Sequence, residues 1–304
     1  MPNPLNYEMI IKDSRTKVSI DGSCRDLNVF IPVRGRHPFL VPCLNYLKRA
    51  GLEANINIAI TIIENDEHPQ YEAYCTQYKI NYIFVPNAIA HAEGMFAKAL
   101  AYNIGFLLTE RTEWNVFHDL DILVEQDFFK SLLGYMAKCK TWIQPYSQKR
   151  VVRLNATETG NIVMNPEATF DLKGMGRPAN PGSPGGSIVV RSEDFINVGG
   201  YDPEYFYGYS PEDAFFWAKL EVLHKVINEV FSTHFQGSAM YADDPVIDVY
   251  HMDHPNSEGS NNKQNLMLNY LSSFYRTSYD RKRFFIDTKR ANFIQTIEQL
   301  RATC

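Results

Sequence analysis

The fold of this 304-residue chain is decided by the stretch Trp114-Asn-Val-Phe-His-Asp-Leu-Asp-Ile-Leu-Val124. An apolar strand ends there in two carboxylates, Asp119 and Asp121, one residue apart. In an extended chain residues i and i+2 point to the same side, so both carboxylates are predicted to face one ligand. Such oxygen donors suit Mg²⁺ or Mn²⁺, with diphosphate oxygens completing the shell. The alternative is that the two aspartates only cap a turn.

Apolar runs rich in β-branched residues alternate with helical patterns around this stretch. Strands are predicted over residues 27–33, 56–63, 81–85, 114–117, 141–144, 188–191 and 246–250. Helices are predicted over residues 37–50, 70–78, 92–108, 126–138, 193–198 and 213–224, with Ser192 as a cap. This βαβα order predicts an α/β fold with a doubly wound, mainly parallel sheet that binds ligands at the carboxyl ends of its strands.

The chain is predicted to form a single domain. Residues 1–26 are an unpatterned lead-in, residues 27–256 the α/β domain, and residues 257–304 a flexible loop followed by helices. Residues 147–184 are rich in the glycine, proline and asparagine that break regular structure. So long a loop in a compact domain is usually a binding loop or lid.

Composition excludes several classes of protein. The net charge of −5 argues against a nucleic-acid binder. No apolar run approaches the roughly 18–20 residues of a membrane span, and the first residues lack the pattern of a signal peptide. The cysteines are odd in number and form no CxxC pair, which favours free thiols in a reducing compartment. They are Cys24, Cys43, Cys75, Cys139 and Cys304. We therefore expect a cytoplasmic protein.

One basic and aromatic stretch stands out near the end of the chain. It consists of Arg281-Lys-Arg283, Phe284-Phe285 and Lys289-Arg290. The favoured interpretation is a solvated face of an amphipathic helix. The functional alternative is peripheral contact with the acidic inner face of a membrane.

Three further segments occur in order along the chain. They are Phe30-Ile-Pro-Val-Arg-Gly-Arg36, the run from Gly182 through Gly199-Gly-Tyr-Asp202 to Tyr205-Phe-Tyr-Gly-Tyr-Ser-Pro-Glu-Asp213, and Tyr250-His-Met-Asp-His-Pro255. Together with Asp119-Leu-Asp121, Phe96-Ala-Lys98 and Asn103-Ile-Gly-Phe106, they resemble the β-1,4-galactosyltransferase family and its bacterial relatives. The resemblance covers roughly residues 28–256. It implies a GT-A (Rossmann-like) glycosyltransferase fold, a divalent cation, a UDP-sugar donor and a glycan acceptor.

The resemblance implies a metal site built from two segments. Asp121 matches the metal-ligating aspartate, Asp119 lies nearer the donor sugar, and His254 matches the metal-binding histidine. His251 stands where the animal enzymes have methionine, and an imidazole gives a harder site, so Mn²⁺ and Mg²⁺ both stay open. The alternative is that these are two ordinary surface histidines.

The same resemblance assigns the acceptor side. Asp213 is implied as the general base and Glu212 as the residue that holds the acceptor, while Tyr207 and Tyr209 replace the family's tryptophans as an aromatic platform. Ala214 replaces a third acidic residue to which we assign no chemical role. The alternative is that the two carboxylates only contribute favourable charge to the first turn of a helix.

Donor contacts are implied for residues of five segments. These are Pro32, Val33, Arg34, Arg36, Glu64, Asp66, Phe96, Lys98, Asp119, Ser183, Gly185 and Gly186. Ser183 occupies the position where galactose-specific enzymes carry a tyrosine, so a smaller side chain leaves room for an N-acetyl group. The alternative is that the flanking prolines give this loop another path.

These residues predict a metal-dependent, inverting glycosyltransferase. It would move a hexose or N-acetylhexosamine from a UDP-sugar to a glycan hydroxyl. The alternative from another class is a non-catalytic carbohydrate-binding or assembly protein that keeps the fold. A sugar nucleotidyltransferase is disfavoured because Val33-Arg-Gly-Arg-His37 is not a glycine-rich phosphate loop.

Overall fold

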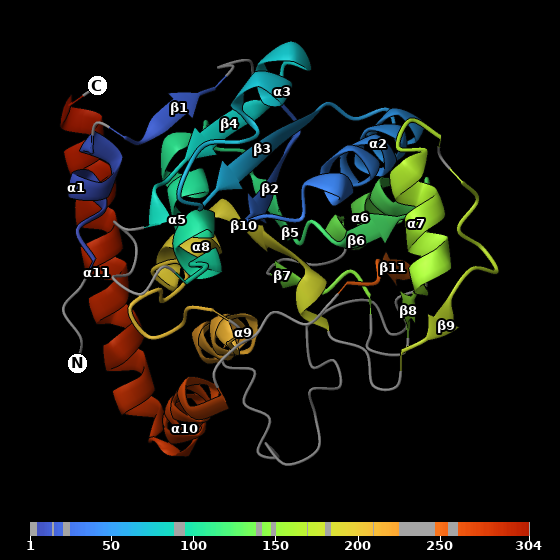
Figure 1. The fold of residues 1–304 in the computed structure, drawn as a ribbon. Helices are drawn as coiled ribbons and strands as arrows, with labels where there is room; N and C mark the ends of the chain where they lie inside the picture. The colour runs from blue at the N-terminus through green and yellow to red at the C-terminus, as the bar shows by residue number, and fades with distance from the viewer. Residues whose placement is uncertain are drawn as a thin grey trace.

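The computed structural model of the chain describes residues 5–13, 15–20, 25–87, 95–137, 142–146, 150–168, 170–179, 184–208, 210–224, 247–254 and 261–303. Within these residues a seven-stranded mixed sheet forms the centre of the molecule (Figure 1). Its order is β1 (Lys17–Ser19), β4 (Asn81–Phe84), β3 (Ile58–Glu64), β2 (Leu27–Val33), β5 (Trp114–His118), β10 (Ser187–Arg191) and β7 (Trp142–Ile143).

The four strands β4, β3, β2 and β5 are parallel to one another, and β1 and β10 pair antiparallel at their two sides. The predicted α/β fold with a mainly parallel sheet is therefore confirmed. Because β2, β3 and β5 run in the same direction, the loops that follow Val33, Glu64 and His118 meet at one edge of the sheet. Four of the residues predicted to bind the donor, Arg34, Arg36, Asp66 and Asp119, follow these three strands.

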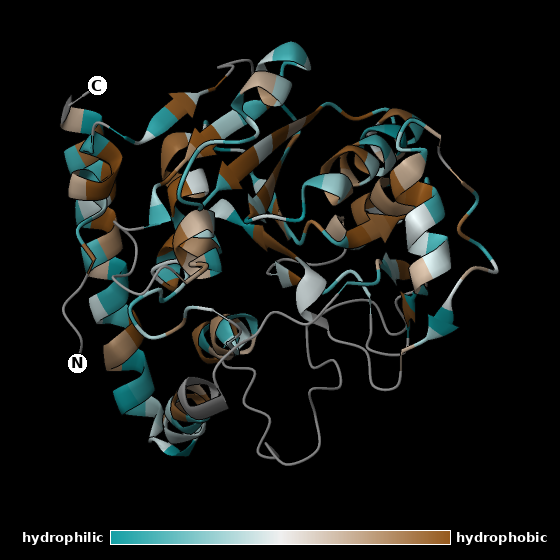
Figure 2. Cartoon of the chain, in the orientation of Figure 1, coloured by the Kyte–Doolittle hydropathy of each residue, from teal (hydrophilic) through white to brown (hydrophobic). Residues whose placement is uncertain are grey.

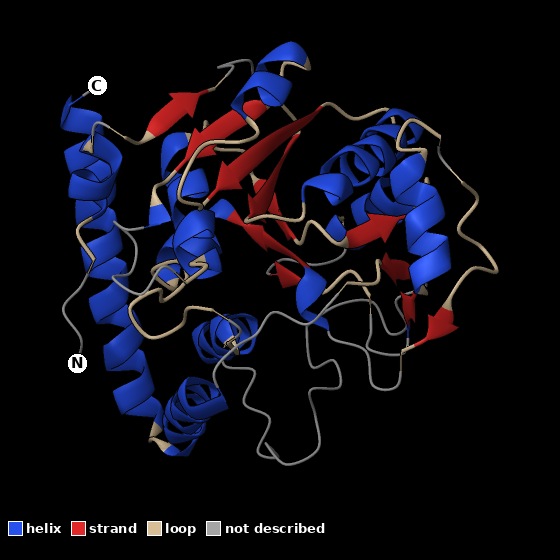
Figure 3. Ribbon diagram, viewed as in Figure 1, coloured by secondary structure: helices blue, strands red, loops and turns tan. Residues whose placement is uncertain are grey.

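Helices cover both faces of the sheet (Figures 1 and 3). The alternation of side chains along a strand explains why both faces are apolar. Val29 and Ile31 of β2 pack in one cluster with α2, whereas Phe30 packs in another with α5, α8 and α11. Figure 2 shows the resulting concentration of hydrophobic residues along the central strands. The helices are α2 (His37–Glu53), α5 (Lys98–Leu108), α6 (Phe128–Met136), α8 (Ser192–Asn197) and α11 (Tyr279–Thr303), with α1 (Tyr7–Lys12) and α3 (Glu72–Gln77) at the periphery.

A second, four-stranded sheet lies beside the first. Its order is β6 (Ile122–Val124), β11 (Val249–His251), β8 (Val151–Arg153) and β9 (Arg177–Pro178). In the antiparallel pair of β6 and β11, His251 lies opposite Ile122. This pairing brings the end of β11 beside the two aspartates that precede β6.

A third apolar cluster joins the last helices to the domain. Helix α9 (Glu212–Leu223) contributes Phe215, α10 (Asn261–Arg276) contributes Leu271 and Phe274, and α11 contributes Ile286. The predicted C-terminal helices are therefore present, and α10 begins at Asn261, inside the stretch predicted as a flexible loop. Among the described residues, no helix is long and apolar enough to cross a membrane. Cys43 and Cys75 are buried free thiols, and the other three cysteines lie outside the described residues.

Several predicted elements differ from the structure. The predicted loop over residues 147–184 contains β8, β9 and α7 (Ala156–Met164). A capping box between Asn155 and Glu158 starts α7, and this signal was present in the sequence. The predicted lead-in contains α1 and β1. The helix predicted from residue 92 begins at Lys98, with residues 95–97 non-helical and residues 92–94 outside the described residues. Ser192 does not cap α8 because its hydroxyl donates to the carbonyl of Thr112 at 2.6 Å.

Candidate active site

The loop after β2 turns sharply toward the second sheet. Gly35 and Arg36 both have left-handed backbones, with φ of 57° and 53°. The turn is held by Asp66, whose carboxylate accepts the N–H of Gly35 at 3.2 Å, and by Tyr71, whose hydroxyl donates to the Gly35 carbonyl at 2.7 Å. The Arg36 guanidinium then reaches back and forms an ion pair with Asp121. Two predicted donor residues, Arg36 and Asp66, are thereby fixed at the carboxyl edge of the sheet.

Lys98 is the centre of a cluster of carboxylates. It begins α5, and its ammonium lies 2.8 Å from Asp119, 2.9 Å from Asp213 and 3.4 Å from Glu212. The side chains of Lys98 and Glu212 are only 11% and 8% exposed, whereas Asp213 retains 16% and Asp119 27%. The structure thus brings together four of the predicted site residues from three distant segments. Of the two adjacent acids, Asp213 is the one more accessible to a substrate.

Hydroxyl groups surround the same carboxylates. Tyr102 donates to Asp119 at 3.1 Å, Tyr201 lies 3.5 Å from Asp213, and Ser210 donates to Glu212 at 2.6 Å. The sequence analysis did not identify Tyr102 and Tyr201. Their hydroxyls make the site polar while their buried rings exclude water. Tyr102 lies one turn of helix after Lys98, and this i,i+4 spacing was a signal available in the sequence.

The charges gathered in this cluster shift the pKa values of Asp213 and Lys98. Three carboxylates surround one ammonium, so full ionisation would leave a net charge of −2 in a nearly buried site. Burial raises the pKa of Asp213 to about 8; Lys98 opposes this rise, and Glu212 and Asp119 add to it. The pKa of Lys98 is raised well above its usual value, because the carboxylates outweigh the effect of burial. A carboxyl group with a pKa near neutrality is suited to accept and release a proton.

Asp121, His251 and His254 form a set of three potential metal ligands. One ligand atom from each residue lies within 4.8 Å of those of the other two. His254 Nε2 lies 3.0 Å and His251 Nε2 3.9 Å from the Asp121 carboxylate. The set is held in place by the backbone, since the N–H of Met252 donates to the Asp121 carbonyl at 2.9 Å. Asp119 is directed to Lys98 and stays outside this set.

The chemistry of these three residues fits a divalent transition metal ion. Burial opposes ionisation of Asp121, but the hydrogen bond with His254 and the neighbouring His251 and Arg36 lower its pKa well below its usual value. Burial lowers the pKa of His251, which favours the neutral imidazole that binds a metal. One carboxylate and two imidazoles suit Mn²⁺ better than Mg²⁺, which prefers oxygen ligands alone. Three protein ligands leave coordination positions for a substrate.

Gly186 allows a close approach between the two sheets. Its carbonyl accepts the N–H of Asp119 at 2.8 Å. A Cβ on this residue would lie 2.6 Å and 2.8 Å from side-chain atoms of Ile122 and 2.8 Å from the hydroxyl of Tyr146. The Gly186 backbone therefore fixes the position of Asp119, and a side chain at Gly186 would overlap Ile122 and Tyr146. Its neighbour Gly185 belongs to the same 3₁₀ turn, residues Pro184–Gly186.

Gly186→Ala is expected to destabilise the protein by about 1–3 kcal/mol, because the added methyl group would overlap the side chains of Ile122 and Tyr146. Gly134→Ala is the matched control, since nothing lies within 4 Å of its Cβ and it sits inside α6. The control should be stabilised by about 0.5–1 kcal/mol. Denaturant unfolding of both variants measures the difference. Equal stability of the two variants would contradict this account of Gly186.

The aromatic segment predicted to bind the acceptor is only partly described. Tyr207 is half-buried, and the next residue, Gly208, donates its N–H to the Phe96 carbonyl at 2.7 Å. This bond joins the segment to the start of α5, so Phe96 contributes through its backbone at this point. Tyr205 packs against Tyr270 of α10 with ring centroids 4.1 Å apart. Tyr209 lies outside the described residues.

A buried ion-pair network that sequence analysis missed supports this segment from behind. Lys219 of α9 and Asp202 form an ion pair in which both side chains are fully buried. Lys289 of α11 lies 3.3 Å from Asp202 and 2.5 Å from Glu204. Removing one partner of such a pair leaves an uncompensated buried charge. Ion pairs therefore join α11 to the turn that contains Asp202 and Glu204, which precedes Glu212 and Asp213.

Other predicted donor residues have different surroundings. Pro32 and Val33 are buried in β2, and Arg34 is half-buried just after it. Glu64 is fully buried. Its carboxylate accepts the N–H groups of Gln70 at 3.0 Å and Tyr71 at 3.2 Å and the hydroxyl of Tyr82. Glu64 thus holds the loop after β3, and its assignment to the donor stays a prediction. Ser183 lies outside the described residues, and its assignment stays a prediction.

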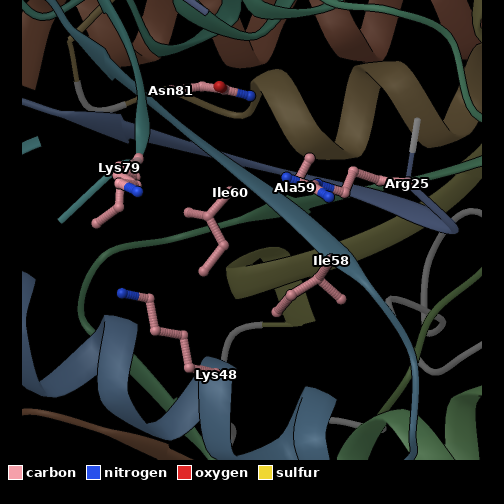
Figure 4. A pocket seen from close by; sticks show the side chains of 8 residues that line it. Arg25, Lys48, Ile58, Ala59, Ile60, Lys79 and Asn81 are labelled. Carbon is pink, nitrogen blue, oxygen red and sulfur yellow. The ribbon is translucent and has the colours of Figure 1, made fainter. Parts of the chain in front are cut away.

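A small pocket of about 80 Å³ lies away from this site (Figure 4). Lys48, Lys79 and Ile60 are among the residues that line it, at the amino ends of β3 and β4. The candidate active site lies at the opposite, carboxyl ends of these strands. The pocket is therefore not part of it.

Comparison with known proteins gives structural likenesses only. No protein-family model matches the chain, and no curated protein does. The catalytic domain of Drosophila β1,4-galactosyltransferase 7 is similar with a TM-score of 0.43 and 14% identity, over 80% of this chain and 79% of that one. Residues 1–349 of Staphylococcus aureus TarS give a TM-score of 0.46 and 10% identity, over 89% of this chain and 71% of that one. At these TM-scores the likenesses carry no conclusion about function.

Proposed function

We propose that this chain is a metal-dependent, inverting glycosyltransferase that moves a hexose or N-acetylhexosamine from a UDP-sugar to a glycan hydroxyl. The observation that carries the proposal is the convergence of two sets of residues at one edge of the sheet. Lys98, Asp119, Glu212 and Asp213 form one set, and Asp121, His251 and His254 form the other. Asp119 and Asp121 join the two sets through a single turn.

The set formed by Asp121, His251 and His254 supplies what a diphosphate leaving group requires on the donor side. When bound by Asp121, His251 and His254, a divalent cation would neutralise negative charge on the diphosphate. Arg36, which forms an ion pair with Asp121, would supply a further positive charge to the diphosphate. Lys98 provides a second positive charge within a hydrogen-bond length of Asp119. Asp119 would accept hydrogen bonds from the sugar hydroxyls.

The cluster around Lys98 supplies the proton transfer, through Asp213. Asp213 takes the proton of the acceptor hydroxyl as its oxygen forms a bond to the anomeric carbon. The bond from that carbon to the diphosphate breaks on the opposite side, so the configuration inverts and UDP leaves with the electron pair. Glu212, held by Ser210 at 2.6 Å, orients the acceptor. Tyr207 provides an aromatic surface beside them.

The alternative, a non-catalytic carbohydrate-binding protein, does not account for the cluster around Lys98. Burying three carboxylates beside one ammonium costs stability, and clusters of this kind are concentrated at catalytic sites. Glycosyl transfer is distinguished from non-catalytic carbohydrate binding by measuring UDP release from a panel of UDP-sugars with and without Mn²⁺. We expect release that depends on Mn²⁺ and increases with a glycan acceptor. Binding of the sugars without any release would favour the alternative.

The pH dependence follows from the raised pKa of Asp213. A general base acts only when deprotonated, so kcat/KM should rise about tenfold per pH unit below pH 8 and level off above it. The profile of kcat/KM reports the free enzyme, in which the pKa is about 8. Initial rates at low UDP-sugar concentration between mildly acidic and alkaline pH measure it. A flat profile across this range would contradict the role of Asp213.

A further inference from the structure

The elbow between α10 and α11 carries a concentration of positive charge. Residues 276–290 include six lysines and arginines and two aspartates, which gives +4 in a chain with a net charge of −5. All other residues together therefore carry −9. A local charge opposite to that of the remaining surface attracts and orients an anionic partner.

The structure separates the outward-facing part of this stretch from the inward-facing part. Lys289 is bound to Asp202 and Glu204, and Phe285 packs in the third apolar cluster, so both belong to the interior. Arg276 and Arg281 instead line an open hollow of about 560 Å³ together with Ser273, Thr277 and Ser278. Neither arginine forms an ion pair with any residue that the structure describes. No acidic residue lines the hollow.

Exposed apolar side chains occur on both helices that contribute residues to this hollow. Phe284 is 70% exposed and follows Arg281 by three residues of α11. Leu266 is 67% exposed and precedes Ser273 by seven residues of α10. Spacings of three and seven residues place side chains on the same face of a helix. The face formed by Leu266, Ser273, Arg276, Arg281 and Phe284, here called the arginine elbow, is therefore both cationic and apolar.

We propose that the arginine elbow docks on an anionic lipid bilayer. In this arrangement Arg276 and Arg281 bind lipid phosphates in the hollow, and Phe284 and Leu266 enter the boundary between headgroups and acyl chains. The positive charge of the arginine elbow favours an anionic partner. Its exposed apolar side chains favour a lipid surface over a purely polar polyanion. The inference goes beyond the proposed glycosyl transfer and does not depend on it.

The test is co-sedimentation of the full chain with vesicles of phosphatidylcholine, with and without phosphatidylserine. We expect binding to the anionic vesicles that weakens with added salt, and little binding to the neutral ones. Arg276→Gln with Arg281→Gln should weaken binding by roughly fivefold per arginine, about 25-fold together. The control pair is Lys130→Gln with Lys173→Gln, two exposed lysines elsewhere on the surface, which should bind like the unaltered chain.

A second pair of variants tests how much the exposed apolar side chains contribute to vesicle binding. Phe284→Ser should weaken vesicle binding several-fold, whereas Met164→Ser, at a side chain that is 72% exposed on α7, should leave it unchanged. Equal losses in test and control variants, equal binding to both kinds of vesicle, or no binding would overturn the proposal. Binding of inorganic phosphate or polyglutamate without binding to vesicles would also overturn it, because the partner would then be a soluble anion. Thermal unfolding confirms that each variant is folded.

Discussion

Asp213→Asn is expected to abolish sugar transfer while UDP and Mn²⁺ still bind. Asparagine has the shape of aspartate and can still accept a hydrogen bond from Lys98, which lies 2.9 Å away, but it cannot take up a proton. Loss of a general base lowers turnover by about 10²–10⁴-fold. Because binding of the donor is assigned to other residues, the effect should fall on kcat and leave the affinity for UDP unchanged. Initial rates and calorimetric titration with UDP measure the two quantities.

A matched control is available on another helix. Asp194 also lies in the first turn of a helix and also has a basic partner, His224 at 3.2 Å, but it is outside the Lys98 cluster. Asp194→Asn should retain near-native turnover. Near-native turnover of Asp213→Asn, or an equal loss in both variants, would show that Asp213 is not the base.

Asp121→Asn and His254→Ala are each expected to weaken Mn²⁺ binding by about 100-fold or more, since even residues that only orient metal ligands contribute about 10–100-fold. Each change removes one of three converging ligands. The fold should survive, because the surrounding strands β6 and β11 are paired through their backbones. Calorimetric titration with Mn²⁺ gives the affinity, and excess Mn²⁺ should partly restore turnover of His254→Ala.

His68→Ala is the control for the metal site, since His68 is exposed and lies after β3, apart from the three ligands. Its Mn²⁺ affinity should equal that of the unaltered chain. An unchanged affinity in both Asp121→Asn and His254→Ala would mean that the cation binds elsewhere or not at all.

The sequence predicted the sheet and its active edge well because both follow from local pattern. The apolar run over residues 27–33 coincides with β2. The acidic pair, Asp119 and Asp121, directly follows β5, as predicted. The geometry of that pair is different from the prediction. Residues 119–121 form a turn, with the N–H of Ile122 bonded to the Asp119 carbonyl at 3.2 Å, so the i,i+2 rule for extended chains does not apply. Asp119 and Asp121 therefore face two neighbouring sets of partners.

The parts that sequence analysis missed depend on contacts between distant segments. Strand β6 has only three residues and exists through its pairing with β11, more than 120 residues later in the sequence. The buried pair of Asp202 and Lys219 has no local signature, because a lysine within an amphipathic helix usually faces solvent. Glu64 faces inward because the following loop supplies backbone N–H donors, which the sequence does not display.

The central claim is that the Asp121–His251–His254 set and the Lys98 cluster form one donor site. It is tested most directly by measuring the affinity for UDP with Mn²⁺ and with a chelator. Two ligands that bind in contact must strengthen each other equally, and couplings of this kind are typically about 5–150-fold. We predict that Mn²⁺ tightens UDP binding by at least about tenfold and that Asp121→Asn removes this gain. If UDP binds equally well with and without Mn²⁺, the two sets of residues do not form a single site and the account is wrong.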